Sequence, residues 1–316
     1  KLLKTFQMKI FKNELLNQKY LEEGYVIVKL FNSKDISEIK KFAKKMYADT
    51  VSNLHGFSTL PNPHISDEKC VAIHDFFKQL IARKKDEGLS QYLTEDFQFF
   101  NSVFLRKKTK STNFYWHIDP SFYNQKKHER PVAIWGSIDK ITTHNGCLQV
   151  VPKSHKLGYD YHPFSFLPLG DIKKEQLSEV YAELIKKHAI DITLQKGEVI
   201  IHDHALIHAS RPNNSLFRKR LAFKFTYLPK EVKDFQMTYF DNKKDELNIH
   251  RFNKDDIYYY TSKTVGNYIE NFKEMNDQLI TKISIGKLKK PFQTLSEMEE
   301  IMTTPIDSSK AKFEIC

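Results

Sequence analysis

The sequence predicts an all-β core, an antiparallel sandwich or barrel, with α-helices flanking it on the N-terminal and C-terminal sides. Short segments rich in β-branched and aromatic residues fill the middle of the chain, and turn residues such as Asn145-Gly146 and Lys196-Gly197 separate them. Short strands with this punctuation are typical of such cores. The predicted strands are residues 99–105, 114–119, 132–138, 147–151, 190–194, 198–202 and 220–227.

The N-terminal region is predicted to be a scaffold of helices around one strand. Its apolar residues recur at helical spacing in three segments, and a β-rich run follows the first of them. Gly56, Pro61 and Pro63 predict a loop before the third helix. The expected elements are a helix at 12–24, a strand at 25–30, a helix with an N-cap at Ser33, a loop at 52–66 and a helix at 67–83.

The C-terminal region has a weaker pattern. A helix at 174–188 interrupts the strands, and after residue 227 the sequence becomes mixed and polar, with helices expected at 268–280 and 294–302. We expect a single domain over residues 1–316. It would comprise a scaffold at 1–95, the β core at 96–230 and a C-terminal extension at 231–316.

Composition narrows the function classes. The 316 residues include 24 Phe and 15 Tyr and carry a formal charge of +11, which fits a globular, basic protein. The lysines are scattered, as in Lys40-Lys41, Lys44-Lys45 and Lys84-Lys85, so we expect solvated faces and no nucleic-acid partner. A weaker alternative is that the positive field attracts an anionic substrate. No apolar run reaches the roughly eighteen residues of a membrane span, so no membrane partner is expected.

The cysteines indicate the compartment. Cys70, Cys147 and Cys316 are an odd number and widely spaced, which gives neither a disulfide framework nor a thiolate zinc site. We therefore expect a cytoplasmic or other reducing location and a monomer. The chain does not begin with Met, so this expectation leaves room for a leader that has been removed.

A His-x-Asp pair marks the first candidate site. In an extended strand, residues i and i+2 point to the same face, so His117 and Asp119 would present an imidazole and a carboxylate side by side. These are two thirds of a 2-His-1-carboxylate site, which holds Fe(II) on one face and leaves other positions open. The alternative interpretation of the same residues is a polar loop.

The third ligand would come from a distant strand. Residues 202–208 contain His202, His204 and His208, and spacing alone does not choose among them. An arginine lies a dozen residues beyond His208, across one predicted hairpin, where its planar guanidinium can bind a carboxylate through two hydrogen bonds. Iron oxygenases that use 2-oxoglutarate need such a group, because the cosubstrate chelates the metal at one end and presents a free carboxylate at the other.

Residues 97–229 resemble the phytanoyl-CoA dioxygenase family of Fe(II)/2-oxoglutarate oxygenases. Five pieces occur in the family's order and rough spacing, and the resemblance implies a double-stranded β-helix, a jelly-roll or cupin-like fold. The pieces are Trp-His-Ile-Asp-Pro at 116–120, Ala-Ile-Trp-Gly-Ser-Ile-Asp at 133–139, Asn-Gly-Cys-Leu-Gln-Val-Val-Pro-Lys-Ser-His-Lys at 145–156, Lys-Gly-Glu-Val at 196–199, and His-Ala-Ser-Arg-Pro-Asn-Asn-Ser at 208–215 leading to Arg220-Leu221-Ala222.

The resemblance implies roles for individual residues. His117, Asp119 and His208 would be the iron ligands, Arg220 would bind the distal carboxylate of 2-oxoglutarate, and Ser210 would support that carboxylate. The gap from His208 to Arg220 is one residue longer than usual, so Arg218 is the second choice for the carboxylate clamp. Trp135 would line the cosubstrate pocket. His155 and Asn145 match a loop that closes the site, in a structural role.

Structural interpretations compete with several of these roles. Trp135 could belong to the core and Ser210 could cap a turn, while His162, His202 and His204 fit packing better than ligation. Because Asp119 fills the position that a halide takes in related halogenases, halogenation is disfavoured.

The expected activity is oxidation of an unactivated C–H bond by Fe(II), 2-oxoglutarate and O2, giving succinate and CO2 with hydroxylation, cyclisation or desaturation of a small molecule. The substrate is expected to be a partly apolar, carboxylate-bearing, amino-acid-derived metabolite. Two alternatives are a cupin-like metalloenzyme with non-oxidative chemistry and a basic binding protein that has lost catalysis on the same barrel.

Overall fold

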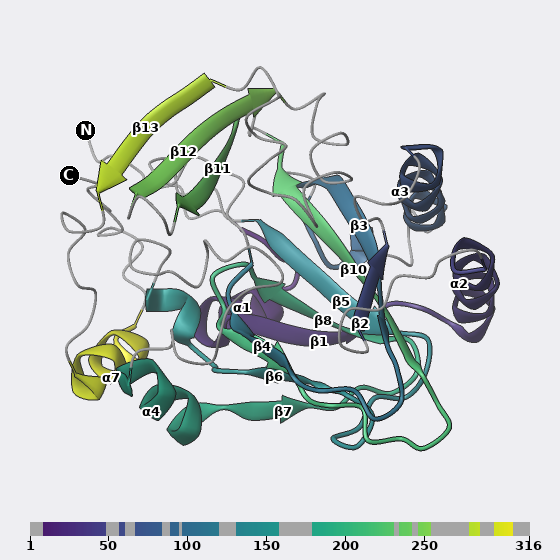
Figure 1. Ribbon diagram of the computed structural model, residues 1–316, viewed down its shortest axis with the longest axis horizontal. Helices are drawn as coiled ribbons and strands as arrows, with labels where there is room; N and C mark the ends of the chain where they lie inside the picture. The colour runs from purple at the N-terminus through teal and green to yellow at the C-terminus, as the bar shows by residue number, and fades with distance from the viewer. Residues whose placement is uncertain are drawn as a thin grey trace.

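Two antiparallel sheets form the core of the protein (Figure 1). The computed structural model describes residues 9–48, 57–60, 67–83, 89–94, 97–119, 131–157, 179–230, 234–241, 246–253, 278–284 and 294–305. The larger sheet has the order β1 (Tyr25–Lys29), β8 (Glu198–Asp203), β5 (Val132–Ser137), β10 (Arg220–Pro229), β3 (Phe97–Lys107) and β2 (Phe57–Leu60). The smaller sheet has the order β4 (Phe114–His117), β9 (His208–Ser210), β6 (Leu148–Val150) and β7 (Ile190–Ile192).

The inner face of the larger sheet packs on the smaller sheet. Trp135, Ile200 and Ala222 come from the larger sheet and join one buried apolar cluster with Leu148 and Val150 of the smaller one. From β3 to β10 the chain therefore passes back and forth between two facing sheets, as in a jelly roll. This arrangement confirms the predicted double-stranded β-helix with flanking helices.

Phenylalanines cover the outer face of the larger sheet. Phe223 and Phe225 alternate with the inward residues of β10, and the ring centroid of Phe77 lies 4.7 Å from that of Phe225. Phe77 belongs to α3 (Asp67–Ala82), which lies with α2 (Ser33–Met46) on this side of the sheet (Figure 1). A Cβ on Gly136 would lie 2.8 Å from the Phe223 ring, so this close approach requires glycine.

The N-terminal helices begin and end on identifiable caps. Asn13 caps α1 (Glu14–Glu23), which ends at Gly24 with φ 82°, a left-handed conformation that favours glycine. The sequence prediction placed the cap of α2 at Ser33, which is wrong by one residue. Asn32 is the N-cap and completes a capping box with Asp35, because its amide oxygen accepts from two backbone N–H groups while Asp35 accepts from the Asn32 N–H.

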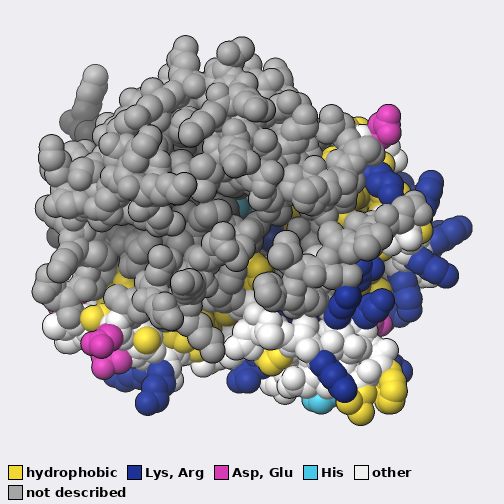
Figure 2. All heavy atoms as spheres, viewed as in Figure 1, with side chains coloured by type: hydrophobic (Ala, Val, Ile, Leu, Met, Phe, Trp, Pro, Cys, Tyr) yellow, Lys and Arg dark blue, Asp and Glu magenta, His cyan; other side chains and the backbone are white. Residues whose placement is uncertain are grey.

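The basic residues of α2 face solvent. Lys40, Lys41, Lys44 and Lys45 are all exposed. Figure 2 shows Lys and Arg side chains gathered on the side of the molecule where Figure 1 places α2 and α3. Much of the visible positive charge therefore lies on the outer helical side of the larger sheet.

Two strands occur where the sequence analysis expected none. β2 lies within the predicted loop at 52–66 and pairs with β3 at its edge, and β9 covers residues 208–210, which are absent from the predicted strands. Both strands are short, so the pairing with a distant strand decides their conformation and local propensity does not. The strands β1 and β2 come from the predicted scaffold and join strands of the predicted core in one sheet.

The C-terminal part holds a third sheet that the sequence did not predict. Its order is β11 (Asp234–Asp241), β12 (Glu246–Asn253) and β13 (Gln278–Ser284). The helix predicted at 268–280 is wrong at its last three residues, which begin β13; the earlier part lies outside the described residues. The β-branched residues of β13 favour an extended conformation once β12 supplies a partner.

Two helices on the C-terminal side match the prediction closely. α4 (Glu179–His188) lies within the segment predicted at 174–188, and α7 (Leu295–Thr303) begins at Thr294, whose side chain caps it. Met298 and Met302 of α7 pack on Leu184 and Ile185 of α4. Short 3-10 turns occur at Leu89–Gln91 and Ser154–Leu157. Among the helices in the described ranges, none is long and apolar enough to cross a membrane.

Candidate metal centre and cosubstrate pocket

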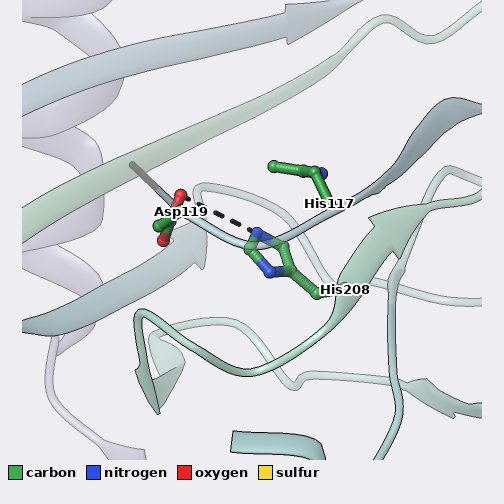
Figure 3. Close-up of side chains that lie close together, drawn as sticks. All are labelled: His117, Asp119 and His208. Atoms are coloured by element: carbon green, nitrogen blue, oxygen red, sulfur yellow. Dashed lines mark ion pairs between the residues drawn. The ribbon is translucent and has the colours of Figure 1, made fainter. Parts of the chain in front are cut away.

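The three proposed iron ligands lie together at the edge of the smaller sheet (Figure 3). β4 and β9 pair antiparallel with His117 directly opposite His208, and their ring centroids are 4.2 Å apart. Asp119 follows two residues after His117. One ligand atom from each of the three residues lies within 4.8 Å of the other two, so a single ion can contact all three.

The His208 ring is held in the orientation that a metal ligand needs. Its Nδ1 lies 2.8 Å from the Leu206 carbonyl, to which it donates, so Nε2 keeps its lone pair and faces Asp119 Oδ1 at 3.9 Å. Burial lowers the pKa of His208 to about 3, although the charge of Asp119 opposes the shift. The imidazole is therefore neutral near pH 7, as metal binding requires.

Asp119 is buried and ionised. Burial alone would raise the pKa of this carboxyl, but Lys224 and the nearby histidines outweigh that effect and hold it well below its usual range. Oδ1 forms an ion pair with Lys224 Nζ, and Oδ2 has no hydrogen-bond partner among the described residues. Two imidazoles and one carboxylate with a free oxygen are the donor set that suits Fe(II) with open positions.

His202 and His204 lie beside the three residues but do not belong to the group whose ligand atoms converge on one point. His202 ends up beside His208, with ring centroids 4.9 Å apart, and its Nδ1 lies 2.9 Å from the Asp203 carbonyl. His204 lies in the turn after β8, where its Nε2 is 4.0 Å from Asp119 Oδ2 and its carbonyl accepts from the Asp119 N–H at 2.9 Å. His162 lies outside the described residues.

Arg220 forms the opposite end of the site. Its guanidinium is buried, and Nε and Nη1 have no hydrogen-bond partner within the described part of the chain. Burial lowers the pKa of Arg220 to about 10, so the group stays charged at neutral pH. An uncompensated buried charge is costly, which indicates that an anion belongs beside it. A carboxylate with two oxygens fits the planar donor pattern.

The other residues predicted for the cosubstrate pocket are Trp135, Ser210 and Arg218, and they take different positions. The Arg220 Cζ lies 5.3 Å from the centre of the Trp135 ring, and Trp135 also belongs to the buried cluster between the sheets. Trp135 is therefore both pocket wall and core. Ser210 is buried on β9, and its carbonyl accepts from Lys107 Nζ at 3.1 Å. Arg218, the second choice for the clamp, has an exposed side chain, which favours Arg220.

His155 and Asn145 take structural positions. His155 Nε2 lies 3.0 Å from the Leu21 carbonyl, and a Cβ on Gly24 would lie 2.5 Å from its Nδ1, so this ring packs against the end of α1. The Asn145 amide accepts from Thr142 N–H at 2.8 Å and donates to the Lys140 carbonyl at 2.8 Å. These contacts close a turn.

Two lysines of the site were missed at the sequence level. Lys107 is buried directly opposite Arg220 in the register, and its Nζ donates to the carbonyls of Thr112, Ser210 and Arg211. Burial, and after it the charge of Arg220, lower the pKa of Lys107 to about 6. Lys224 lies on the same face of β10 as Arg220. The period of two along a strand was the signal that would have found Lys224, since residues 220, 222 and 224 share a face.

Comparison with known proteins shows the family of this chain. The family model for phytanoyl-CoA dioxygenase (PhyH) matches residues 20–221, nearly two thirds of the chain. The chain belongs to the phytanoyl-CoA dioxygenase family. Enzymes of this family are non-haem iron oxygenases that use Fe(II), 2-oxoglutarate and O2, which confirms the expected reaction class and cofactors.

Individual relatives are distant. The chain is 26% identical over 223 residues to ectoine dioxygenase of Sphingopyxis alaskensis, which covers 64% of the chain and 71% of that protein. It is 23% identical over 225 residues to human peroxisomal phytanoyl-CoA dioxygenase, which covers 65% of the chain and 66% of that enzyme. A non-heme alpha ketoglutarate dependent epimerase, SnoN from nogalamycin biosynthesis, matches with a TM-score of 0.52 at 18% identity, over 72% of this chain and 82% of SnoN. At this identity, the match shows the fold alone.

Proposed function

We propose that this family member oxidises an unactivated C–H bond of a small organic molecule, with hydroxylation as the simplest outcome and succinate and CO2 as co-products. The observation that carries the proposal is a buried guanidinium without a hydrogen-bond partner in the described part of the chain, on the same face of β10 as Lys224, whose Nζ pairs with Asp119 of the 2-His-1-carboxylate cluster. When bound, Fe(II) with 2-oxoglutarate supplies the oxidising chemistry.

The residues of the chain would bind and orient the metal and the cosubstrate. His117, Asp119 and His208 would bind the metal on one side, where the hydrogen bond from His208 Nδ1 to Leu206 fixes which nitrogen faces the ion. Arg220 would bind the distal carboxylate of the cosubstrate, with Trp135 against its guanidinium and Ser210 in support. Apolar groups between the sheets exclude water from this interior.

The substrate is narrowed by the chemistry of the site and not by the family. Relatives named for ectoine and for phytanoyl-CoA differ in substrate, so membership leaves it open. We propose a partly apolar small molecule that carries a carboxylate, because Arg220 and Lys224 share one face of β10, with the Trp135 ring beside Arg220 and Asp119 in contact with Lys224. The presence of Asp119 as a third protein ligand leaves its position closed to a halide and favours oxidation over halogenation.

Anaerobic reconstitution tests the proposal. Fe(II) and 2-oxoglutarate together should give the metal-to-ligand absorption band of a chelated complex, and O2 should then release succinate. His208→Ala should lose both signals, while the Arg218→Ala variant, which removes an exposed cation, should keep both. Neither band nor succinate from the wild-type protein would contradict the proposal. Turnover with Zn(II) and without 2-oxoglutarate would instead support non-oxidative chemistry.

A further inference from the structure

Lys224 places a second cation inside the proposed site. It lies on β10 four residues after Arg220, on the inner face, where it is the register partner of Trp135 on β5. Its Nζ pairs with Asp119 Oδ1, and its side chain is 19% exposed while that of Asp119 is 4% exposed. The lysine is therefore more exposed than the buried carboxylate that it contacts.

The two cations of β10 lie at different ends of the proposed site. Arg220 lies beside Lys107 and Trp135, whereas Lys224 contacts Asp119. Four residues of strand span about 13 Å, at roughly 3.3 Å per residue. In the function proposed above, Arg220 would bind the distal carboxylate of 2-oxoglutarate, which would leave Lys224 available to another group.

The charges at the metal end do not balance without a further anion. Asp119 and the chelating carboxylate of 2-oxoglutarate together neutralise the two positive charges of Fe(II), since histidines bind metals in their neutral form. The positive charge of Lys224 is then left over among the described residues. A metal held by Asp119 would also draw electron density from the carboxylate and would weaken the ion pair between Asp119 and Lys224.

On the basis of the function proposed above, we propose that Lys224 selects the charge of the substrate. Its ammonium binds a carboxylate or similar anionic group of the substrate beside the metal, which orients the rest of the molecule towards the reacting position. The competing role is a positioning residue that stays on Asp119 and only supports the metal ligand. Charge selectivity separates the two roles, because a support for Asp119 affects acidic and neutral ligands alike.

The test uses full-length protein loaded anaerobically with Fe(II) and 2-oxoglutarate. Hydrophobic monocarboxylic acids and their primary amides of matched size are titrated in, and the shift of the metal-to-ligand absorption band reports their binding. The wild-type protein should bind the acids at least about 10-fold more tightly than the amides, as expected for a hydrogen bond to a charged partner. Lys224→Gln should reduce that preference to about 1, and Lys224→Arg should restore most of it.

Lys219→Gln is the matched control, because Lys219 is an exposed cation next to the start of the same strand. It should keep the wild-type preference. A preference that survives in Lys224→Gln, or a wild-type protein that binds acids and amides equally or binds neither, would overturn the assignment. The absorption band forms before any acid is added, so its absence from the wild-type protein would contradict the proposed function instead.

Discussion

The metal end and the clamp end of the proposed site accommodate buried charges in different ways. At the metal end, charged and polar groups have protein partners: His208 donates to Leu206, and Asp119 Oδ1 pairs with Lys224, while Asp119 Oδ2 has no hydrogen-bond partner among the described residues. At the clamp end, Arg220 is just as buried but has two nitrogens without a hydrogen-bond partner in the described residues. At the metal end, a metal ion can therefore take the place of Lys224 beside Asp119. At the clamp end, Arg220 can bind an anion.

The largest effect should follow from removing a ligand at the metal end. His208→Ala should reduce succinate formation by more than about 100-fold, because loss of an outer partner of a ligand alone costs roughly 10- to 100-fold. Coupled assays at saturating 2-oxoglutarate measure this. His144→Ala, which removes an exposed histidine, should match the wild-type protein. Turnover that persists in His208→Ala would assign the third ligand elsewhere, with His202 the first alternative.

The next effect belongs to the clamp end. Arg220→Gln should raise the 2-oxoglutarate concentration for half-maximal turnover by about 30-fold or more, because removing one partner of a buried charge pair costs about 2 kcal/mol or more. Turnover at saturation should change less, since the metal ligands remain. Arg218→Gln is the control. If Arg218→Gln raised this concentration and Arg220→Gln did not, the clamp would be Arg218.

Acid should destabilise the metal end and alkali should stabilise the clamp end. In the folded, metal-free protein His202 has a pKa of about 4 against 6.5 when unfolded. The unfolded chain therefore binds more protons between these values, and the free energy of unfolding falls as the pH drops from 6.5 to 4. Lys107 has a pKa of about 6 in the folded protein against 10.5 when unfolded. By the same rule, the free energy of unfolding rises as the pH increases from 6 to 10.5.

Urea unfolding from pH 4 to pH 10 measures both limbs, each on the order of a few kcal/mol. His202→Asn should reduce the acid limb, to which His208 with its pKa of about 3 also contributes, and should leave the alkaline limb unchanged. Lys107→Met should reduce the alkaline limb and leave the acid limb unchanged. An acid limb that is unchanged in His202→Asn would show that this histidine is protonated in the folded protein.

The smallest effect concerns the wall between the two ends. Trp135→Phe should raise the 2-oxoglutarate requirement about 2- to 5-fold, because a cation–π contact contributes about 0.5–1 kcal/mol and Phe keeps most of the apolar surface. The other tryptophan, Trp116, packs in a different cluster. In the Trp116→Phe variant, Trp135 is the remaining tryptophan, and its fluorescence should change when 2-oxoglutarate binds. An unchanged signal would place the cosubstrate away from this ring.

The same contrast explains how much the sequence could predict. Arg220 and Trp135 lie in long, regular strands of the larger sheet, and alternation along β10 places Arg220 inside once the strand is recognised. The choice of His208 over His202 and His204 depends on where β8 ends and on the pairing of β9 with β4, which are long-range properties. Lys224 was missed because its role depends on Asp119, which is distant in sequence.

The helices were predicted well because their signals are local. Apolar spacing predicts α1, α3 and α7 within a few residues. The strands β2, β9 and β11 to β13 were missed, since short strands take their conformation from partners elsewhere in the chain. The division of the chain at residues 95 and 230 remains a prediction.

Because His117 pairs with His208, a bound metal should stabilise the edge strand β4. β4 is the edge strand of the smaller sheet, and a register shift separates its two paired positions, so few ladder bonds retain it. An ion held by His117 on this edge strand and His208 on its neighbour closes a loop of about ninety residues without a covalent bond. Amide hydrogens of residues 114–119 should therefore exchange more slowly with metal than without it, and loss of metal should release the edge before the rest of the fold.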